Sequence, residues 1–522
     1  MMNIKQNNHM LMAWLLIAGC TILRCFYASS FHLTPDETNY WQWSRYLAWG
    51  YHDQAPMIAW TIRLFTNLLG HTELAVRLPS IVSMAIASIY MVLIAERWFS
   101  SKIAWHTALF SQSVFVFNVG ALLATADGLQ GAAWAASSYY VGRGFEHHQW
   151  RHWIAGGLCF GLGLLSKYTM VLFLPFVFAF GLLRFRHRLW AYRPYIGCAM
   201  GLAMFIPVIL WNAANNWNSV RHVAYLGGAN DRFKINLNYF AEYLGSQVGL
   251  VTPLAFGVIC AGWVWSIRHF RHDKGWIHGY LLFTSLPMVA GFALLSLHTR
   301  VYGNWPCAGY ITACVLAAAL FSQYRDVGEN RKREGTRRIW SWAVASAYVL
   351  TLVVLTHVLL PILPIPAKLD RTAYEIHDWD RLAATVAQTQ QEMPDPHKTF
   401  IFGLRYQIAS ELAFYMPNNP LTVSINRWNR PNVYDYWWQD EDLLEKDAVG
   451  VMRYSDRREK LQQIFKKVDA PEPFYVYLDK AADQRGDPDM LVKTLYVYRC
   501  YGFQGGLRWQ SPHQDDIRVS AA

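Results

Sequence analysis

Long apolar runs separated by short polar stretches fill the chain up to about residue 365. The runs cover residues 11–31, 78–96, 103–123, 127–142, 153–166, 168–185, 194–212, 246–267, 276–297, 305–322 and 339–363. Most approach the ~20 apolar residues that an α-helix needs to cross a bilayer. The pattern predicts a polytopic α-helical membrane domain at residues 1–365, with about 11 transmembrane helices.

The pattern changes after residue 365, where charged residues and short alternating segments take over. Residues 399–403 form a short apolar run, and residues 406–415 suit a helix. Strands are predicted at residues 449–451, 474–478 and 494–501, which are rich in β-branched and aromatic residues. This part contains no Gly-rich phosphate loop and no GxSxG motif. Residues 366–522 are therefore predicted to form a soluble α/β domain without a recognisable enzymatic motif of its own.

The net charge of +11 raises the question of nucleic-acid binding, but the positions of the charges argue against it. Lys and Arg gather in alternate short loops between apolar runs, for example near Arg97, Arg143 and Arg186. This distribution is typical of cytoplasmic loops in membrane proteins. It places the loop at 31–77 and the C-terminal domain on the outer side of the membrane.

Residues 31–77 are too polar to span a membrane and too apolar for a solvated loop. Two groups of Trp and Tyr residues fall around helical turns, and such residues favour the headgroup level of a bilayer. The interpretation favoured by this pattern is two interfacial helices joined near Gly50–Pro56. The alternative is a loop that packs on the soluble domain.

Several polar residues fall on the predicted outer side, where a charge near the membrane is costly unless it has a partner or a wet cavity. They are Asp36, Glu37, Tyr40, Asp53, Asp127, Lys167, His298 and Arg300. Each also has a simpler interpretation. Asp36 and Asp127 could stabilise the starts of helices, and Lys167 could reach toward lipid headgroups. His298 and Arg300 could bind lipid phosphate without taking part in catalysis.

Taken together, these residues suit transfer of a group from a lipid-phosphate donor. A carboxylate would take the proton of an attacking hydroxyl. Lys167 and Arg300 would offset the charge that develops on the departing phosphate. Such a donor needs no nucleotide-binding motif, and none is present.

Four pieces of the sequence resemble one known group of enzymes. They are residues 35–60 (PDETNYWQWSRYLAWGYHDQAPMIAW), 77–80, 161–175 and 304–310, and the Asp127 segment lies between them in the same order. The chain resembles the GT-C superfamily of polytopic glycosyltransferases that use lipid-linked sugars. The most similar branch is the bacterial part of the dolichyl-phosphate-mannose–protein mannosyltransferase family (glycosyltransferase family 39), which includes the aminoarabinose transferases of lipid A.

The resemblance implies a catalytic carboxylate at Asp36, with Asp53 and Asp127 in support. It also implies donor-phosphate contacts around Tyr40, Lys167 and Arg300, an undecaprenyl-phosphate-linked sugar, and inverting transfer at the periplasmic face. A divalent cation, used by some members, could be held by Asp53 and Asp127. Two positions depart from the family pattern: Gln54 replaces a basic residue or His, and Asn39 replaces the Arg of the aminoarabinose transferases.

We therefore predict a glycosyltransferase of the bacterial inner membrane that moves a sugar from a polyprenyl phosphate to a hydroxyl of a cell-envelope acceptor, such as lipopolysaccharide. The predicted catalytic residues are Asp36, Glu37, Asp53 and Asp127, and the predicted donor-phosphate residues are Tyr40, Lys167, Arg300 and His298. The alternative is a transporter or flippase of lipid-linked sugars. A transporter would show inverted repeats and matching broken helices, which the sequence does not. A structural assembly factor would leave the acidic residues without a role.

Overall fold

A computed structural model describes residues 2–229, 232, 234–271, 275–327 and 330–508, and the chain forms two compact units. The bundle unit comprises Met1–Ala28, Leu47–Leu68 and Leu74–Leu355. The sheet unit comprises Ser29–Tyr46, Leu69–Glu73 and Thr356–Ala522. The predicted boundary at residue 365 assigns Ser29–Tyr46 to the membrane domain, whereas in the structure this early segment groups with the C-terminal part.

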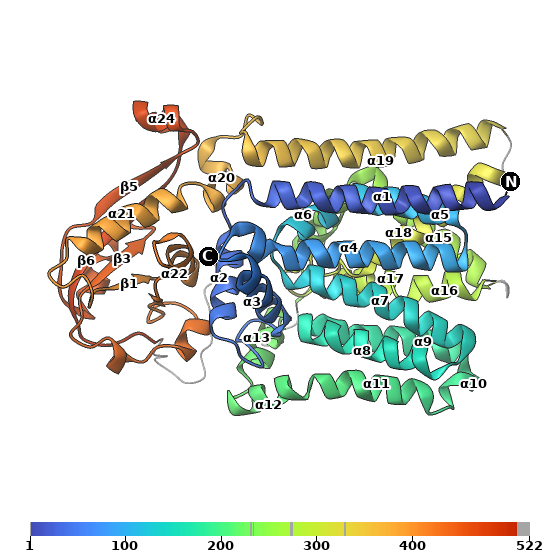
Figure 1. Cartoon of the computed structure of the whole chain (residues 1–522), viewed down its shortest axis with the longest axis horizontal. Coiled ribbons are helices and arrows are strands. Elements are labelled where there is room, and N and C mark those ends of the chain that lie inside the picture. Colours follow the sequence, from blue (N-terminus) through green and yellow to red (C-terminus); the bar gives the residue numbers. More distant parts are fainter. Residues whose placement is uncertain (1, 230–231, 233, 272–274, 328–329, 509–522) are drawn as a thin grey trace. The chain divides into compact units, whose positions relative to one another are not determined.

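The bundle unit is helical, and its helices are labelled in Figure 1. They are α1 (Met2–Ala28), α3 (Met57–Leu69), α4 (Glu73–Trp98), α5 (Ser101–Ser113), α6 (Phe115–Leu122), α7 (Ala126–His147), α8 (Trp150–Ser166), α9 (Phe173–Arg184), α10 (Arg186–Leu189), α11 (Arg193–Met204), α12 (Ile206–Ala214), α13 (Asn218–Leu226), α14 (Leu237–Val251), α15 (Pro253–Arg271), α16 (Trp276–Phe283), α17 (Leu286–Leu295), α18 (Gly309–Val327) and α19 (Asn330–Leu359).

Four described segments are long and apolar enough to cross a membrane: Asn8–Ala28, Glu73–Trp98, Trp276–Leu295 and Glu334–Leu359. Two bent helix pairs raise this number to six if each pair is one span. The sharper bend, of 102°, lies between α14 and α15, where Pro253 begins a new helix directly after Thr252 with its positive φ of 75°. Eleven spans remain a prediction, because several apolar runs fold as shorter or broken helices.

Small residues bring α8 and α11 together. A Cβ atom added to Gly157 would lie 1.8 Å from the carbonyl oxygen of Gly197, so only glycine permits this approach of two backbones. In the centre of the bundle, Trp134 is buried and its indole N–H donates to the Thr284 carbonyl at 3.0 Å. Such pairing satisfies a polar atom that would otherwise be costly in an apolar interior.

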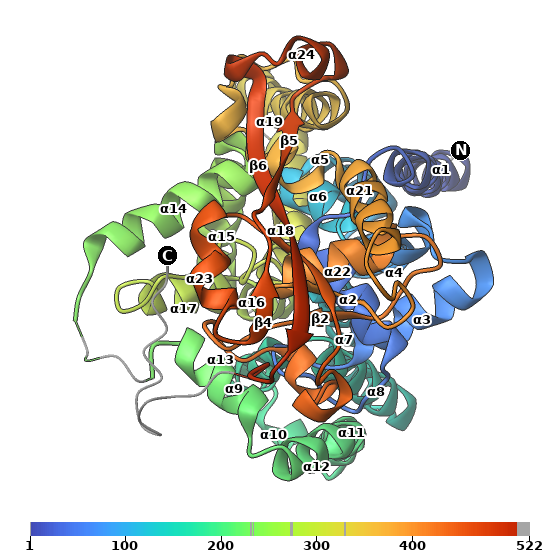
Figure 2. The ribbon, with the colours of Figure 1, turned by 90° about the vertical axis from the view of Figure 1, so that its left-hand side faces the viewer.

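The sheet unit contains a six-stranded mixed sheet, and Figure 2 shows its long strand β6. The strands are β1 (Phe400–Gly403), β2 (Thr422–Ser424), β3 (Ala448–Met452), β4 (Phe465–Val468), β5 (Glu472–Tyr477) and β6 (Leu491–Phe503), and the helices of this unit are α2 (Pro35–Arg45), α20 (Arg371–Ile376), α21 (Trp379–Gln391), α22 (Tyr406–Tyr415), α23 (Arg458–Leu461) and α24 (Lys480–Arg485).

The strand order is β2-β1-β3-β6-β4, with β5 also paired to β6. The pairs of β1 with β2 and β3 are parallel, and β6 runs antiparallel to β3, β4 and β5. The three predicted strands correspond to β3, β5 and β6, and the predicted helix is α22. The short apolar run at 399–403 forms β1. Strand β2 was not predicted because it has only three residues, and β4 was not predicted because two Lys residues interrupt its apolar pattern.

Helix α2 packs on other elements of the sheet unit, as the alternative interpretation of residues 31–77 expects. Its place at a membrane surface stays a prediction. The ring of Trp41 packs edge-on against Phe414 of α22, with centroids 4.9 Å apart. The amide of Gln42 donates to the Tyr434 hydroxyl at 3.1 Å, and Arg45 donates to the Asn419 carbonyl at 2.9 Å. The alternative of packing on the soluble domain therefore holds for this helix.

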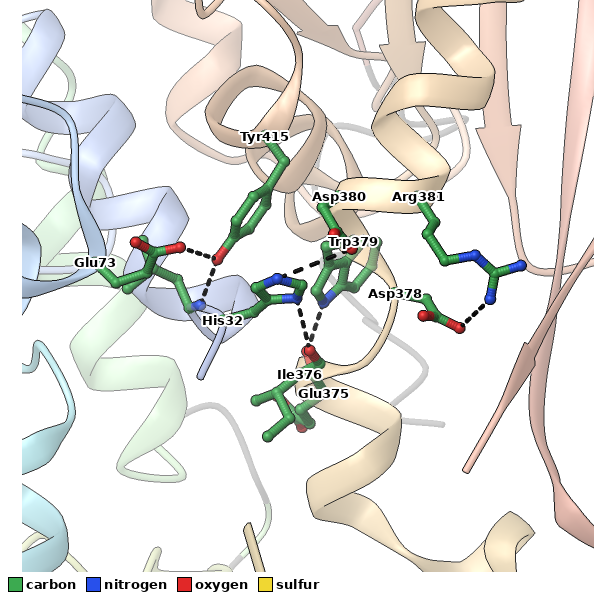
Figure 3. Close-up of polar contacts among 10 residues, drawn as sticks. His32, Glu73, Glu375, Ile376, Asp378, Trp379, Asp380, Arg381 and Tyr415 are labelled. Atoms are coloured by element: carbon green, nitrogen blue, oxygen red, sulfur yellow. Dashed lines mark hydrogen bonds and ion pairs between the residues drawn. The ribbon is translucent and has the colours of Figure 1, made fainter. Parts of the chain in front are cut away.

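The segment before α2 is held by hydrogen bonds to α20 and α22 of the same unit (Figure 3). The His32 ring nitrogen Nδ1 lies 3.1 Å from the Ile376 carbonyl oxygen. The backbone N–H of Leu33 donates to the Tyr415 hydroxyl at 2.6 Å. That hydroxyl in turn donates to Glu73 at 3.4 Å. These contacts fix the start of α2, and with it the acidic motif at Asp36, against the C-terminal part of the chain.

Candidate functional site

Asp127 and Lys167, which are 40 positions apart in sequence, form an ion pair in the bundle unit. Lys167 is the C-cap of α8, and Asp127 lies in the first turn of α7. Lys167 Nζ donates to Asp127 Oδ1 at 2.6 Å, and the side chains are 8% and 16% exposed. The Asn304 amide donates to the other carboxylate oxygen at 3.0 Å. Two predicted residues are thus brought together, and Asn304 joins them.

An apolar cavity of about 200 Å³ opens beside this group. Asp127 and Asn304 line it, together with apolar side chains of α4, α6 and α18 that include Met84, Phe117 and Ile311. The charged Lys167–Asp127 pair and the Asn304 amide therefore lie next to an apolar cavity. Ligands with a charged head and a hydrocarbon tail have the same two parts.

A second group in the bundle unit contains His52, Asp53 and His222. Asp53 Oδ1 lies 3.2 Å from His222 Nε2, and the two His rings have centroids 5.2 Å apart. One potential ligand atom from each residue lies within 4.8 Å of the others. This is the one group of metal-ligating type found among the described residues.

Two imidazoles and a carboxylate are ligands that suit Zn²⁺ or a similar first-row ion. The predicted cation ligand Asp53 belongs to this group, whereas the oxygens of Asp127 contact Lys167 and Asn304. Sequence reasoning missed His222. It lies on the short helix α13, with no spacing motif that links it to Asp53.

The two groups are connected through Tyr168, which follows Lys167. Its hydroxyl shares a hydrogen bond of 2.7 Å with Ser219, three residues before His222. Tyr168 also interacts electrostatically with Asp53. The turn after α8 and the start of α13 therefore place the ion pair and the histidine group in one region of the bundle.

The predicted residues Asp36, Glu37 and Tyr40 lie on α2 in the sheet unit. Glu37 is 1% exposed and closes a capping box, because its carboxylate accepts from the Thr34 N–H at 2.9 Å. Tyr40 packs edge-on against Trp43, with ring centroids 4.9 Å apart. Asp36 is exposed, and the Tyr406 hydroxyl lies 3.5 Å from its Oδ1. Of the two neighbouring acids, Asp36 alone is open to a substrate.

Asp36 lines a polar cavity of about 130 Å³ within the sheet unit. The cationic side chains of Arg371, Arg453 and Lys493 share this lining, as does Glu375. Arg371 is held by Glu375 at 3.2 Å. Three cations and two carboxylates leave the lining with a formal excess of one positive charge at neutral pH, provided that Lys493 is protonated.

Lys493 is the unusual member of this lining because it is only 8% exposed. Its ammonium donates to the Tyr374 carbonyl and lies 4.1 Å from the centroid of the Trp379 ring. Burial lowers the pKa of Lys493 to about 7, against the attraction of Glu411. Burial also raises the pKa of Glu411 well above its usual value. The charge of this cavity therefore changes near neutral pH.

The two remaining predicted residues lie near α14 and the loop after α17 in the bundle unit. His298 Nε2 lies 3.0 Å from the Gly228 carbonyl oxygen. Arg300 pairs with Glu242 at 2.9 Å, and its side chain is 71% exposed. An exposed, paired Arg is a weaker phosphate ligand than a buried Lys. The donor-phosphate role of these two residues stays a prediction.

The bundle and sheet units contribute different members of the predicted set. Asp36, Glu37 and Tyr40 belong to the sheet unit, and the other predicted residues belong to the bundle unit. That they all act at one membrane face also remains a prediction.

Comparison with known proteins confirms the resemblance seen in the sequence. Residues 53–211 match the family described as dolichyl-phosphate-mannose-protein mannosyltransferase. The lipid A galacturonosyltransferase RgtD of Rhizobium johnstonii is 26% identical over 320 residues, which are 59% of this chain. The match spans 64% of the length of that relative.

The fold is similar to solved structures of two enzymes. Crystal structures of ArnT from Cupriavidus metallidurans include one bound to undecaprenyl phosphate, with a TM-score of 0.63 and 13% identity over 92% of this chain and 97% of that one. The oligosaccharyltransferase AglB from Archaeoglobus fulgidus has a TM-score of 0.55 and 12% identity, covering 85% of this chain and 69% of that one. The chain shares the membrane fold of ArnT, which here is mostly helical with a C-terminal sheet unit.

Proposed function

We propose that this chain, which has the fold of the GT-C membrane glycosyltransferases, transfers a sugar from a polyprenyl-phosphate donor to a hydroxyl of an envelope glycolipid. The observation that carries the proposal is the buried Lys167, held by Asp127 beside the apolar cavity of α4, α6 and α18. The name of the galacturonosyltransferase relative and the lipid in the ArnT crystal structure support these donor and acceptor classes.

In this proposal the Lys167 group binds the donor phosphate. An ammonium has three N–H donors, and the bond to Asp127 uses one of them. Asp127 fixes the position of the ammonium, and the Asn304 amide fixes the carboxylate in turn. As the bond between the sugar and the phosphate breaks, the growing negative charge is stabilised by Lys167. The prenyl chain lies along apolar surface of the bundle.

Asp36 serves as the general base. The acceptor hydroxyl oxygen bonds to the anomeric carbon of the sugar, its proton passes to the Asp36 carboxylate, and the bond from the anomeric carbon to the phosphate oxygen breaks. Attack opposite to the departing phosphate inverts the anomeric configuration. The exposure of Asp36 supports this role, whereas the capping contacts of Glu37 support a structural one.

The cavity beside Asp36 binds an acidic group of the acceptor. Arg453 and Lys493 would pair with a phosphate or carboxylate there, while Asp36 meets the hydroxyl. Lipid A carries such acidic groups, and the relative described above is named a lipid A galacturonosyltransferase.

His52, Asp53 and His222 would hold a divalent cation of the zinc type. A bound cation would supply positive charge for the donor phosphate. These side chains already lie together, with Asp53 Oδ1 3.2 Å from Nε2 of His222.

We place the chain in the bacterial inner membrane with about eleven spans, with the loop containing Asp36 and the C-terminal unit in the periplasm. The distribution of Lys and Arg among the loops supports this orientation. Alkaline phosphatase fused after residue 240 should be active, and a fusion after residue 190 should be inactive.

The test of the function is transfer by purified protein in nanodiscs. Isotope-labelled undecaprenyl-phosphate sugars would be offered with an envelope lipid extract, and wild type compared with Asp36→Asn. Label in a new product with wild type alone is expected. If neither protein consumes donor but wild type moves lipid-linked sugar across the bilayer, the transporter alternative replaces the proposal.

A further inference from the structure

A second charged groove lies far from the Lys167 group, at the other ends of the helices that carry it. Asp127 and Arg143 are separated by sixteen residues of α7, and Arg151 and Lys167 by sixteen positions along α8. At 1.5 Å per residue each separation is about 24 Å, close to the thickness of a bilayer core. Figure 1 shows α4, α7 and α8 as neighbours in the bundle.

This groove has a volume of about 800 Å³ and is open to the surface. Its polar lining consists of Tyr90, Tyr139, Tyr140, Arg143, Arg151 and His152. Its apolar lining comes largely from α4, through Ile86, Ile89 and Leu93. One side of the groove is therefore basic and rich in hydroxyls, and the other is aliphatic.

The basic groups are only partly compensated. Glu146, the nearby acid, is already bound by Arg97 at 2.8 Å, and Arg143 reaches it only at 3.7 Å. Arg143 donates instead to the neutral hydroxyl of Tyr139 at 2.9 Å. Arg151 is exposed. Arg97 and Arg143 thus share the Glu146 carboxylate, and Arg151 adds a further positive charge to the lining of the groove.

His152 is a buried polar group that also lines this groove. It is 6% exposed, and its ring nitrogen Nε2 is buried without a hydrogen-bond partner in the protein. A buried ring nitrogen without a partner costs free energy unless a ligand or water meets it. The hydroxyls of Tyr90 and Tyr140 lie 3.3 Å apart on the same wall.

We infer that this groove is a binding site for an anionic glycerophospholipid. The phosphate would contact Arg143, Arg151 and a Tyr hydroxyl, and an acyl chain would lie along Ile86, Ile89 and Leu93. Basic pockets between transmembrane helices bind anionic headgroups in this way. Arg presents several N–H donors in a planar fork that matches phosphate oxygens. The site does not depend on the proposed transferase function, since it lies at the opposite ends of α7 and α8.

The test uses the full-length protein in detergent, with native mass spectrometry to count bound lipids. Phosphatidylglycerol and phosphatidylcholine with the same acyl chains are titrated separately. Wild type should bind phosphatidylglycerol at least about tenfold more tightly, a difference of about 1.4 kcal/mol. The double variant Arg143→Gln/Arg151→Gln should lose this preference.

The matched control is Arg186→Gln/Arg268→Gln, which removes two exposed charges that do not line the groove. It should bind phosphatidylglycerol as wild type does. Ile89→Trp fills the aliphatic side without changing any charge, and it should also weaken binding. This variant keeps the test valid if the double Arg variant does not fold.

Three outcomes would overturn the inference. One is equal binding of the two lipids by wild type. Another is a groove variant that retains the preference while its thermal unfolding is unchanged. The third is equally strong competition by glycerol phosphate, which would show an anion site without a role for the acyl chain.

Discussion

The Nζ atom of Lys167 lies 2.6 Å from Oδ1 of Asp127, so the end of α8 is joined to the start of α7 by a nearly buried ion pair. Neither partner can be removed alone without leaving the other charge in an apolar setting, which costs about 3–5 kcal/mol for a fully buried pair. The pair therefore has a structural role in addition to its proposed role with the donor phosphate. Variants must separate the two.

Lys167→Met should weaken donor binding and also lower the thermal stability of the protein. A bond to a charged group is worth about 1.5–3 kcal/mol, or roughly 10–100-fold in KM for the donor. Asp127→Asn combined with Lys167→Met should recover much of the stability, because no unpaired charge remains. Recovery of donor KM in this double variant would contradict the role of Lys167, and both properties can be measured in nanodiscs.

Asp36→Asn should lower kcat by about 10²–10⁴-fold, the usual contribution of a general base. Donor binding and thermal unfolding should change little, because Asp36 is exposed. Asp456→Asn, which alters another exposed aspartate of the sheet unit, serves as the control. Full transfer activity in properly inserted Asp36→Asn would exclude Asp36 as the base.

Glu37 is expected to contribute to folding of α2 rather than to chemistry, because its carboxylate caps the helix at Thr34. Glu37→Gln keeps an oxygen that can accept the same hydrogen bond, so it should retain near-wild-type kcat. Glu37→Ala should lower stability by about 1 kcal/mol, as loss of a helix cap does. A large fall in kcat for Glu37→Gln at unchanged unfolding temperature would instead assign a catalytic role.

The His52–Asp53–His222 group should hold one zinc-type ion per protein. Metal analysis of protein purified without chelator should find it, and His222→Ala should reduce the metal content. His187→Ala, which removes an exposed His of the bundle unit, is the control and should not. Equal metal content in wild type and His222→Ala would count against the site.

Lys493 should make acceptor recognition depend on pH near neutrality. Its pKa of about 7 in the folded protein means that its charge is lost as the pH rises through 7. The KM for an acidic acceptor should therefore rise between about pH 6 and pH 8 in wild type. Lys493→Met should have a high KM for the acidic acceptor at both pH 6 and pH 8. The KM of wild type for a neutral acceptor should not change over this pH range.

Lys493 should also make the free energy of unfolding depend on pH. Its pKa lies below the ordinary 10.5, so between about pH 7 and 10.5 the folded protein binds fewer protons than the unfolded chain. The contribution of Lys493 to the free energy of unfolding should rise with pH in that range and be constant below it. Denaturant unfolding of wild type and Lys493→Met across this range measures the difference.

The sequence by itself determined the helical membrane part, the sheet-containing C-terminal part and most of the candidate residues. The reason is that these features are local. Apolar runs of membrane length, strands rich in β-branched and aromatic residues such as β6, and the acidic motif at Asp36 can each be recognised within a short stretch of chain. Helix α22 was predicted with its observed bounds for the same reason.

Only the tertiary structure decided which residues meet. The bond from Lys167 to Asp127, the approach of His222 to Asp53 and the burial of Lys493 beside Trp379 depend on helices and strands far apart in sequence. The assignment of α2 to the sheet unit also depends on distant residues. The sequence of α2 by itself looks like an amphipathic helix, but its Trp41 contacts Phe414 of α22 and its Gln42 donates to Tyr434. The burial and the pairing of these side chains are set by packing between segments that are distant in sequence. The residue pattern along one segment does not identify the segment that it packs against.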